Sequence, residues 1–134
     1  MRGRWLAFFV LLGLLALGGV YAWSERHALF VWHYARQLGT ADATERARLA
    51  EVLAAWEPLA WARLVRQLEN DDADLCHGSA EVMLTWLKRR SATDPKGEQI
   101  AGVLVERWEK LSLPGRGEAS RMVRESQAAA PDAR

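Results

Sequence analysis

The chain has 134 residues, of which 50% are hydrophobic and 26% are charged. This composition excludes a disordered chain, because disordered chains contain too few hydrophobic residues to offset the entropy that folding removes. The 18 basic residues nearly balance the 17 acidic ones, which argues against nucleic-acid binding, and the single cysteine excludes an intramolecular disulfide or a cysteine-rich zinc module. We therefore expect one small folded unit with terminal additions.

The first element in the chain is an uncharged run from Trp5 to Trp23. Its 19 residues would span about 28 Å as a helix, close to the roughly 30 Å hydrocarbon core of a bilayer. Trp5 lies at one end of the run, and Tyr21 and Trp23 lie at the other, where amphipathic rings favour the headgroup level. The pattern predicts an N-terminal transmembrane anchor over residues 1–23 that contacts the lipid bilayer through residues 5–23.

Two other interpretations of this run stay open. Arg2 and Arg4 could be the charged region of a secretory signal that is cleaved near Ala22, which would leave a secreted domain, and the run could also be a buried helix of a soluble protein. The length of the run and the helical pattern that follows favour an uncleaved, single-pass signal anchor. Arg2, Arg4 and the amino group precede the run, whereas Arg26 and Arg36 follow it within twenty residues. This small difference in positive charge favours a cytoplasmic N-terminus and an extracytoplasmic domain.

Residues 24–113 carry apolar residues at helical spacing and show no alternating strand pattern. The spacing predicts five further helical segments, which are 24–38, 42–56, 58–69, 75–90 and 95–111. Short loops between helices make neighbours antiparallel. We therefore predict an all-α fold in which the N-terminal helix precedes a domain of stacked antiparallel helical hairpins, or a small helical bundle, over residues 24–113. Residues 114–134 are expected to form a polar C-terminal tail with room for one short helix from Glu118.

One pair of these segments resembles a known repeat. The sequence PLAWARLVRQLENDDADLCHGSAEVMLTWL, from Pro58 to Leu87, is similar to a HEAT-type helical repeat, although Cys76 stands where that family often has a basic residue. The resemblance covers 30 of the 134 residues. It implies a HEAT-like stack that binds proteins and performs no catalysis. A solenoid needs at least three such units, so the bundle remains the alternative.

The sequence contains no arrangement typical of an enzyme or a metal site. Cys76 and His77 are adjacent, so on a helix they point about 100° apart and cannot share a metal. Asp71, Asp72 and Asp74 lack the glycine and distal glutamate of a calcium loop, and they are instead typical of a turn and a helix N-cap. We therefore expect no enzymatic activity, no cofactor, no metal and no small-molecule substrate.

The best candidate for a partner-binding site is Trp86 with Arg89 and Arg90. These residues are three and four positions apart, so they share one helix face away from the apolar stripe that contains Ala80 and Leu84. Tryptophan and arginine often dominate binding energy at interfaces. Trp86 could instead pack against the next hairpin, with the arginines serving the end of the helix.

The leading prediction is thus a membrane-anchored helical module that binds an unknown protein partner. The alternative is a small structural or accessory subunit of a larger membrane protein complex, in which the Trp5–Trp23 helix packs inside that complex.

Overall fold

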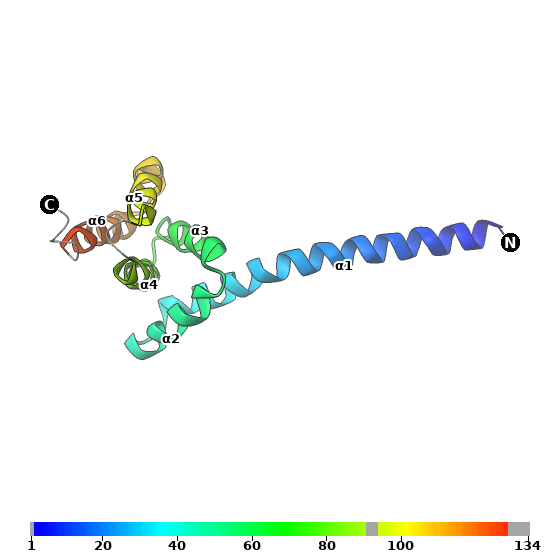
Figure 1. Ribbon diagram of the computed structural model, residues 1–134, viewed down its shortest axis with the longest axis horizontal. Coiled ribbons are helices and arrows are strands. Elements are labelled where there is room, and N and C mark those ends of the chain that lie inside the picture. The colour runs from blue at the N-terminus through cyan, green and yellow to red at the C-terminus, as the bar shows by residue number, and fades with distance from the viewer. Residues whose placement is uncertain (1, 91–93, 129–134) are drawn as a thin grey trace. The chain divides into compact units, whose positions relative to one another are not determined.

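A computed structural model describes residues 2–90 and 94–128. Figure 1 shows the elements in chain order: α1 (Arg2–Arg36), the 3-10 helix η1 (Gln37–Gly39), α2 (Ala43–Ala54), α3 (Glu57–Gln67), α4 (Ala73–Arg89), α5 (Lys96–Glu106), the 3-10 helix η2 (Trp108–Lys110) and α6 (Leu113–Ala128). No strand occurs in the described ranges. The predicted all-α fold is confirmed.

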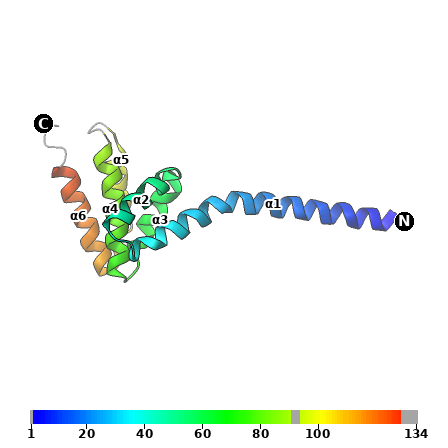
Figure 2. The ribbon, with the colours of Figure 1, turned by 90° about the horizontal axis from the view of Figure 1, so that it is seen from below.

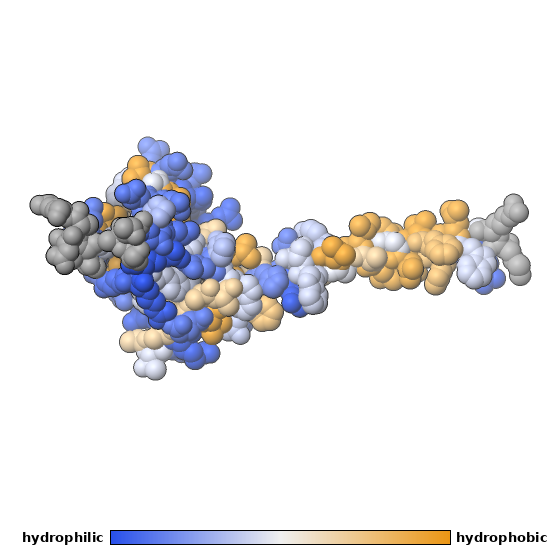
Figure 3. All heavy atoms as spheres, in the orientation of Figure 1, coloured by the Kyte–Doolittle hydropathy of each residue, from blue (hydrophilic) through white to orange (hydrophobic). Residues whose placement is uncertain are grey.

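The chain divides into two compact units, one ending at Phe30 and the other starting at Val31. The first unit is the N-terminal part of α1. Every large apolar side chain between Trp5 and Trp23 is more than half exposed, and Figure 3 shows hydrophobic residues along this part of the helix. Because no proline interrupts the run, the helix continues regularly through it.

The second unit is a helical bundle around α4. Helices α2, α3 and α6 and the 3-10 helix η1 all pack against α4, and Figure 2 shows α6 alongside it. The fully buried large side chains come from every one of these elements: Leu38, Leu49, Leu53, Leu64, Leu68, Met83 and Met122. The core therefore lies around α4, and α4 has buried residues on more than one face.

The hairpin predicted around the acidic turn is present. Near one end of the pair, the rings of Trp61 in α3 and Trp86 in α4 lie 5.2 Å apart. Near the other end, Ser79 Oγ donates a hydrogen bond of 2.6 Å to Gln67 Oε1. Early residues of α3 thus meet late residues of α4, so the two helices are antiparallel. Asp72 caps α4, because its side chain accepts hydrogen bonds from the first-turn backbone.

The prediction of a polar tail from residue 114 needs correction. Leu113–Ala128 form helix α6, and Ala119 and Met122 on this helix are buried. Ser112 Oγ accepts a hydrogen bond of 3.0 Å from the backbone N–H of Gly115, which caps the helix. Pro114 therefore lies in the first turn, where its missing N–H costs no hydrogen bond. The short helix expected from Glu118 is therefore present, but it begins at Leu113 and packs into the bundle.

Candidate functional site

Of the two interpretations of Trp86, the structure supports packing against neighbouring helices and not an exposed partner-binding side chain. Only 4% of this residue is exposed, and its ring packs edge-on against Trp61. Its Nε1 donates a hydrogen bond of 3.2 Å to the backbone carbonyl of Ala50 in α2. The face of α4 that we assigned to solvent is covered by α2 and α3. Trp86 is therefore part of the core.

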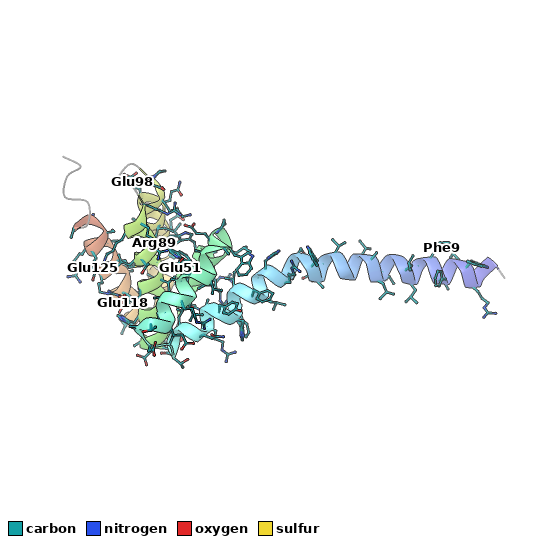
Figure 4. All side chains as sticks on the ribbon, turned by 60° about the horizontal axis from the view of Figure 1, so that its bottom comes forward. Phe9, Glu51, Arg89, Glu98, Glu118 and Glu125 are labelled. Atoms are coloured by element: carbon teal, nitrogen blue, oxygen red, sulfur yellow. The ribbon has the colours of Figure 1, made fainter. Side chains whose placement is uncertain are left out.

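Arg89 and Arg90 lie at the end of α4 and make ion pairs with other elements. Arg89 is exposed and pairs with Glu51 of α2, as Figure 4 shows. Arg90 is half-buried and pairs with Glu57 of α3 and, at 3.0 Å, with Asp94. The backbone N–H of Lys96, followed by the Arg90 guanidinium, holds the pKa of the Asp94 carboxyl below its usual value. Both arginines thus connect α4 to neighbouring segments, and no exposed Trp86 completes a joint surface with them.

Cys76 is a buried structural residue, as the sequence indicates. Its Sγ lies 3.2 Å from the carbonyl oxygen of Asn70 and 3.5 Å from that of Gln67. Burial raises the pKa of the Cys76 thiol. The protonated form, which donates to these carbonyls, is therefore favoured, and a reactive thiolate is disfavoured.

An ionic cluster between α4 and α6 was not predicted. It consists of six side chains, three from each helix: His77, Glu81, Lys88, Glu118, Arg121 and Glu125. The Arg121 guanidinium is central, at 2.7 Å from Glu81 and 2.6 Å from Glu118. Burial disfavours the Arg121 cation, but the carboxylates of Glu118 and Glu81 outweigh it and raise the pKa of this guanidinium. The cluster connects α6 to α4.

The order of the contacts in this cluster gives the direction of α6. Glu118 near the start of α6 meets His77 near the start of α4, at 3.1 Å, and Glu125 meets Lys88 at 3.6 Å. The two helices therefore run parallel, and Figure 4 shows Glu118 and Glu125 spaced along α6. The i, i+3 and i+7 spacing of Glu118, Arg121 and Glu125 was a signal for this charged face, and we did not use it.

A cleft of about 400 Å³ opens between the C-terminal parts of α4 and α6 and helix α5. Its apolar lining comes from all three helices and includes Leu87, Ile100, Leu104 and Met122. Charged side chains, among them Lys88, Arg90, Asp94 and Glu98, also line it. The cleft thus combines an apolar floor with a charged rim.

In the described part of the chain, no group of three or more His, Cys, Asp and Glu side chains could hold a metal ion.

Helix α1 has one further feature besides its apolar surface. The Arg26 guanidinium lies over the Trp23 ring, with Cζ 3.5 Å from the ring centroid, and Arg36 lies over Trp32 at 5.2 Å. The helix is long and apolar enough to span a membrane or to be a signal sequence.

Comparisons of the chain with protein-family models, with curated proteins and with solved structures find no significant match.

Proposed function

We propose that this protein is a membrane-anchored helical module that binds another protein and performs no catalysis. The observation that carries the proposal is the uncharged surface of α1 from Trp5 to Trp23, on which every large apolar side chain is more than half exposed. Transferring one such side chain out of water is worth about 1.5–3 kcal/mol. A run of this length therefore favours a bilayer strongly over water.

Two features support an uncleaved anchor with a cytoplasmic N-terminus. Regular helix continues past Ala22 to Arg36, so the apolar run is the first part of a longer helix that reaches the bundle sequence. Arg2 and Arg4 precede the run, and positive charge favours the cytoplasmic side. In this orientation the bundle would lie outside the cytoplasm.

The bundle would supply the protein-binding surface. The resemblance of residues 58–87 to a HEAT-type repeat supports protein binding, and the end of α4 carries the exposed Arg89–Glu51 pair. Ion pairs also connect the end of α4 to α3 and the middle of α4 to α6, so the helices of the bundle are held in fixed relative positions. We place the partner surface at the α4 end around the exposed Arg89, since Arg90 is half-buried in ion pairs with Glu57 and Asp94.

An accessory subunit of a larger membrane complex is the second candidate. Gly18 and Gly19 have open space where a Cβ would stand, and Ala22 follows one turn after Gly18. Small residues at this spacing let another helix approach closely within a bilayer. In that case α1 itself would be the main contact with the partner.

We expect the chain to remain in the membrane fraction after alkaline washing, with an intact mass that includes Trp5–Trp23. Replacing both Leu12 and Leu15 with arginine should release it, because each arginine at the centre of a membrane helix costs about 2.5–3.5 kcal/mol. The control is Leu59→Arg, which adds charge at a partly exposed position of α3 and should leave membrane retention unchanged. A mature protein that begins at Trp23 would contradict the anchor.

Site-specific photo-crosslinking in native membranes tests the protein-binding surface. A photo-reactive residue in place of Arg89 should crosslink to one discrete protein. The same residue in place of Arg48 should not, although Arg48 is also an exposed arginine paired with a glutamate, at 3.3 Å from Glu45. Equal products from both positions would contradict a partner surface at the end of α4.

A further inference from the structure

Arg26 differs from the paired arginines of the bundle in its contacts. Five arginines of the bundle form ion pairs with carboxylates: Arg48, Arg89, Arg90, Arg107 and Arg121. Within residues 2–90 and 94–128, no carboxylate lies at ion-pair distance from Arg26, and its guanidinium stacks on the Trp23 ring instead. The neighbouring Glu25 does not pair with it. This cation therefore still requires an anion or water.

The position of Arg26 along α1 places it at a particular depth. If Trp5–Trp23 span the hydrocarbon core, Arg26 lies three residues, or about 4.5 Å, beyond its edge. A bilayer is about 40–45 Å thick in total, so each headgroup layer is roughly 5–7.5 Å deep. The backbone of Arg26 thus lies within the headgroup layer.

The stacking also gives the guanidinium a direction. Side chains on an α-helix lean toward its N-terminus, and the distance of 3.5 Å from Cζ to the Trp23 centroid shows that Arg26 follows this rule. The cation is therefore held against the aromatic ring at the edge of the hydrocarbon core. Stacking covers one face of the guanidinium and leaves the N–H groups at its edge free to donate. A planar fork of N–H donors matches the oxygens of a phosphate.

We propose that Arg26, stacked on Trp23, binds the phosphate of a phospholipid headgroup in the leaflet next to the bundle. The inference rests on the proposed membrane anchor and adds to it the specific lipid group and the residue that binds it. The Trp23 ring holds the cation at the boundary between the hydrocarbon core and the headgroups, and the phosphate supplies the negative charge that the described side chains do not.

The chain provides a matched control in Arg36. This residue also lies over a tryptophan one turn before it, at 5.2 Å from the ring centroid compared with 3.5 Å for Arg26, and no carboxylate in the described residues pairs with it. It lies ten residues, or about 15 Å, further along the helix than Arg26, which is beyond the headgroup layer. The two arginines therefore share the type of aromatic partner, and they differ in depth and in how closely they approach the ring.

The test uses the full chain in vesicles of phosphatidylcholine and phosphatidylglycerol, in a buffer without phosphate. Solid-state NMR of carbon-labelled arginine, with dipolar dephasing by phosphorus, detects guanidinium carbons beside lipid phosphate. In a background with Arg2→Lys and Arg4→Lys, which removes the labelled arginines at the other end of the run, we expect a dephased signal that is lost in Arg26→Gln and kept in Arg36→Gln, while both variants keep the circular dichroism spectrum of the background chain.

The outcomes separate this inference from the anchor. A signal that persists in Arg26→Gln, or that disappears in Arg36→Gln, would overturn the assignment to Arg26. If the wild-type chain stays in the vesicles through an alkaline wash but shows no Arg26 signal, the anchor stands and the phosphate site is wrong. Release of the wild-type chain by the wash would overturn both.

Discussion

Replacing Trp86 with alanine should lower the free energy of unfolding by about 3–5 kcal/mol, the usual cost of truncating a buried large aromatic residue. The variant loses the edge-on contact with Trp61 and the hydrogen bond to the Ala50 carbonyl, and it leaves a cavity where α2, α3 and α4 meet. For a domain of this size, the melting temperature should fall by at least about 10 °C. Thermal unfolding of the full chain in detergent, followed by circular dichroism, measures the change.

Trp108 provides the matched control for this prediction. It lies in η2 and is 39% exposed, so Trp108→Ala should change the free energy of unfolding by much less. Trp86→Phe should recover part of the loss, because it restores an aromatic ring but not the indole N–H. Equal melting temperatures for the two alanine variants would show that Trp86 does not belong to the core.

Much of the fold was predictable because its signals are local. Helix starts depend on nearby capping residues such as Asp72, and helical spacing identified the buried Leu64 and Leu84 on the two sides of the acidic turn. The uncharged run that became the first part of α1 needed no tertiary information. These features require only residues within a few positions of one another.

The environment of α4 was not predictable from a single apolar stripe. Its buried residues include Ser79, Val82 and Trp86 in addition to the Ala80–Leu84 stripe. A helix that is apolar on most sides is buried on most sides, and between Gly78 and Leu87 the only charged residue is Glu81. This near absence of charge was the signal that α4 is central. The error at Trp86 followed from treating α4 as a surface helix.

The contacts of the candidate site depend on segments far apart in the chain. Arg89 meets Glu51, and Arg121 meets Glu81, across 38 and 40 residues. No spacing rule within one helix predicts such pairs. The same limit applies to Trp108, which falls inside the helix predicted over residues 95–111. The helix ends at Glu106, and Trp108 then lies in η2 and is partly exposed.

The start of α6 approaches the end of α3 so closely that we expect Gly115→Ala to destabilise the bundle. A Cβ at Gly115 would overlap the carbonyl oxygen of Leu68 and lie 2.8 Å from its carbonyl carbon. Both are backbone atoms, so they cannot move aside as a flexible side chain would. The same carbonyl accepts hydrogen bonds of 3.2 Å from Ser112 N and 3.1 Å from Ser112 Oγ, and any separation of the two segments weakens both.

Overpacking of this kind costs about 1–3 kcal/mol, whereas intrinsic helix propensity alone would favour alanine over glycine by up to about 1 kcal/mol. A loss of stability therefore indicates that the close approach to Leu68 dominates, and a gain indicates that helix propensity dominates. Gly117→Ala is the matched control, because it lies in the same helix and has no atom within 4 Å of the added Cβ. We expect urea denaturation of the full chain in detergent to show a loss of stability for Gly115→Ala and none for Gly117→Ala. A gain in stability for both variants would mean that α6 does not approach Leu68 in this way, and that Gly115 serves no packing role.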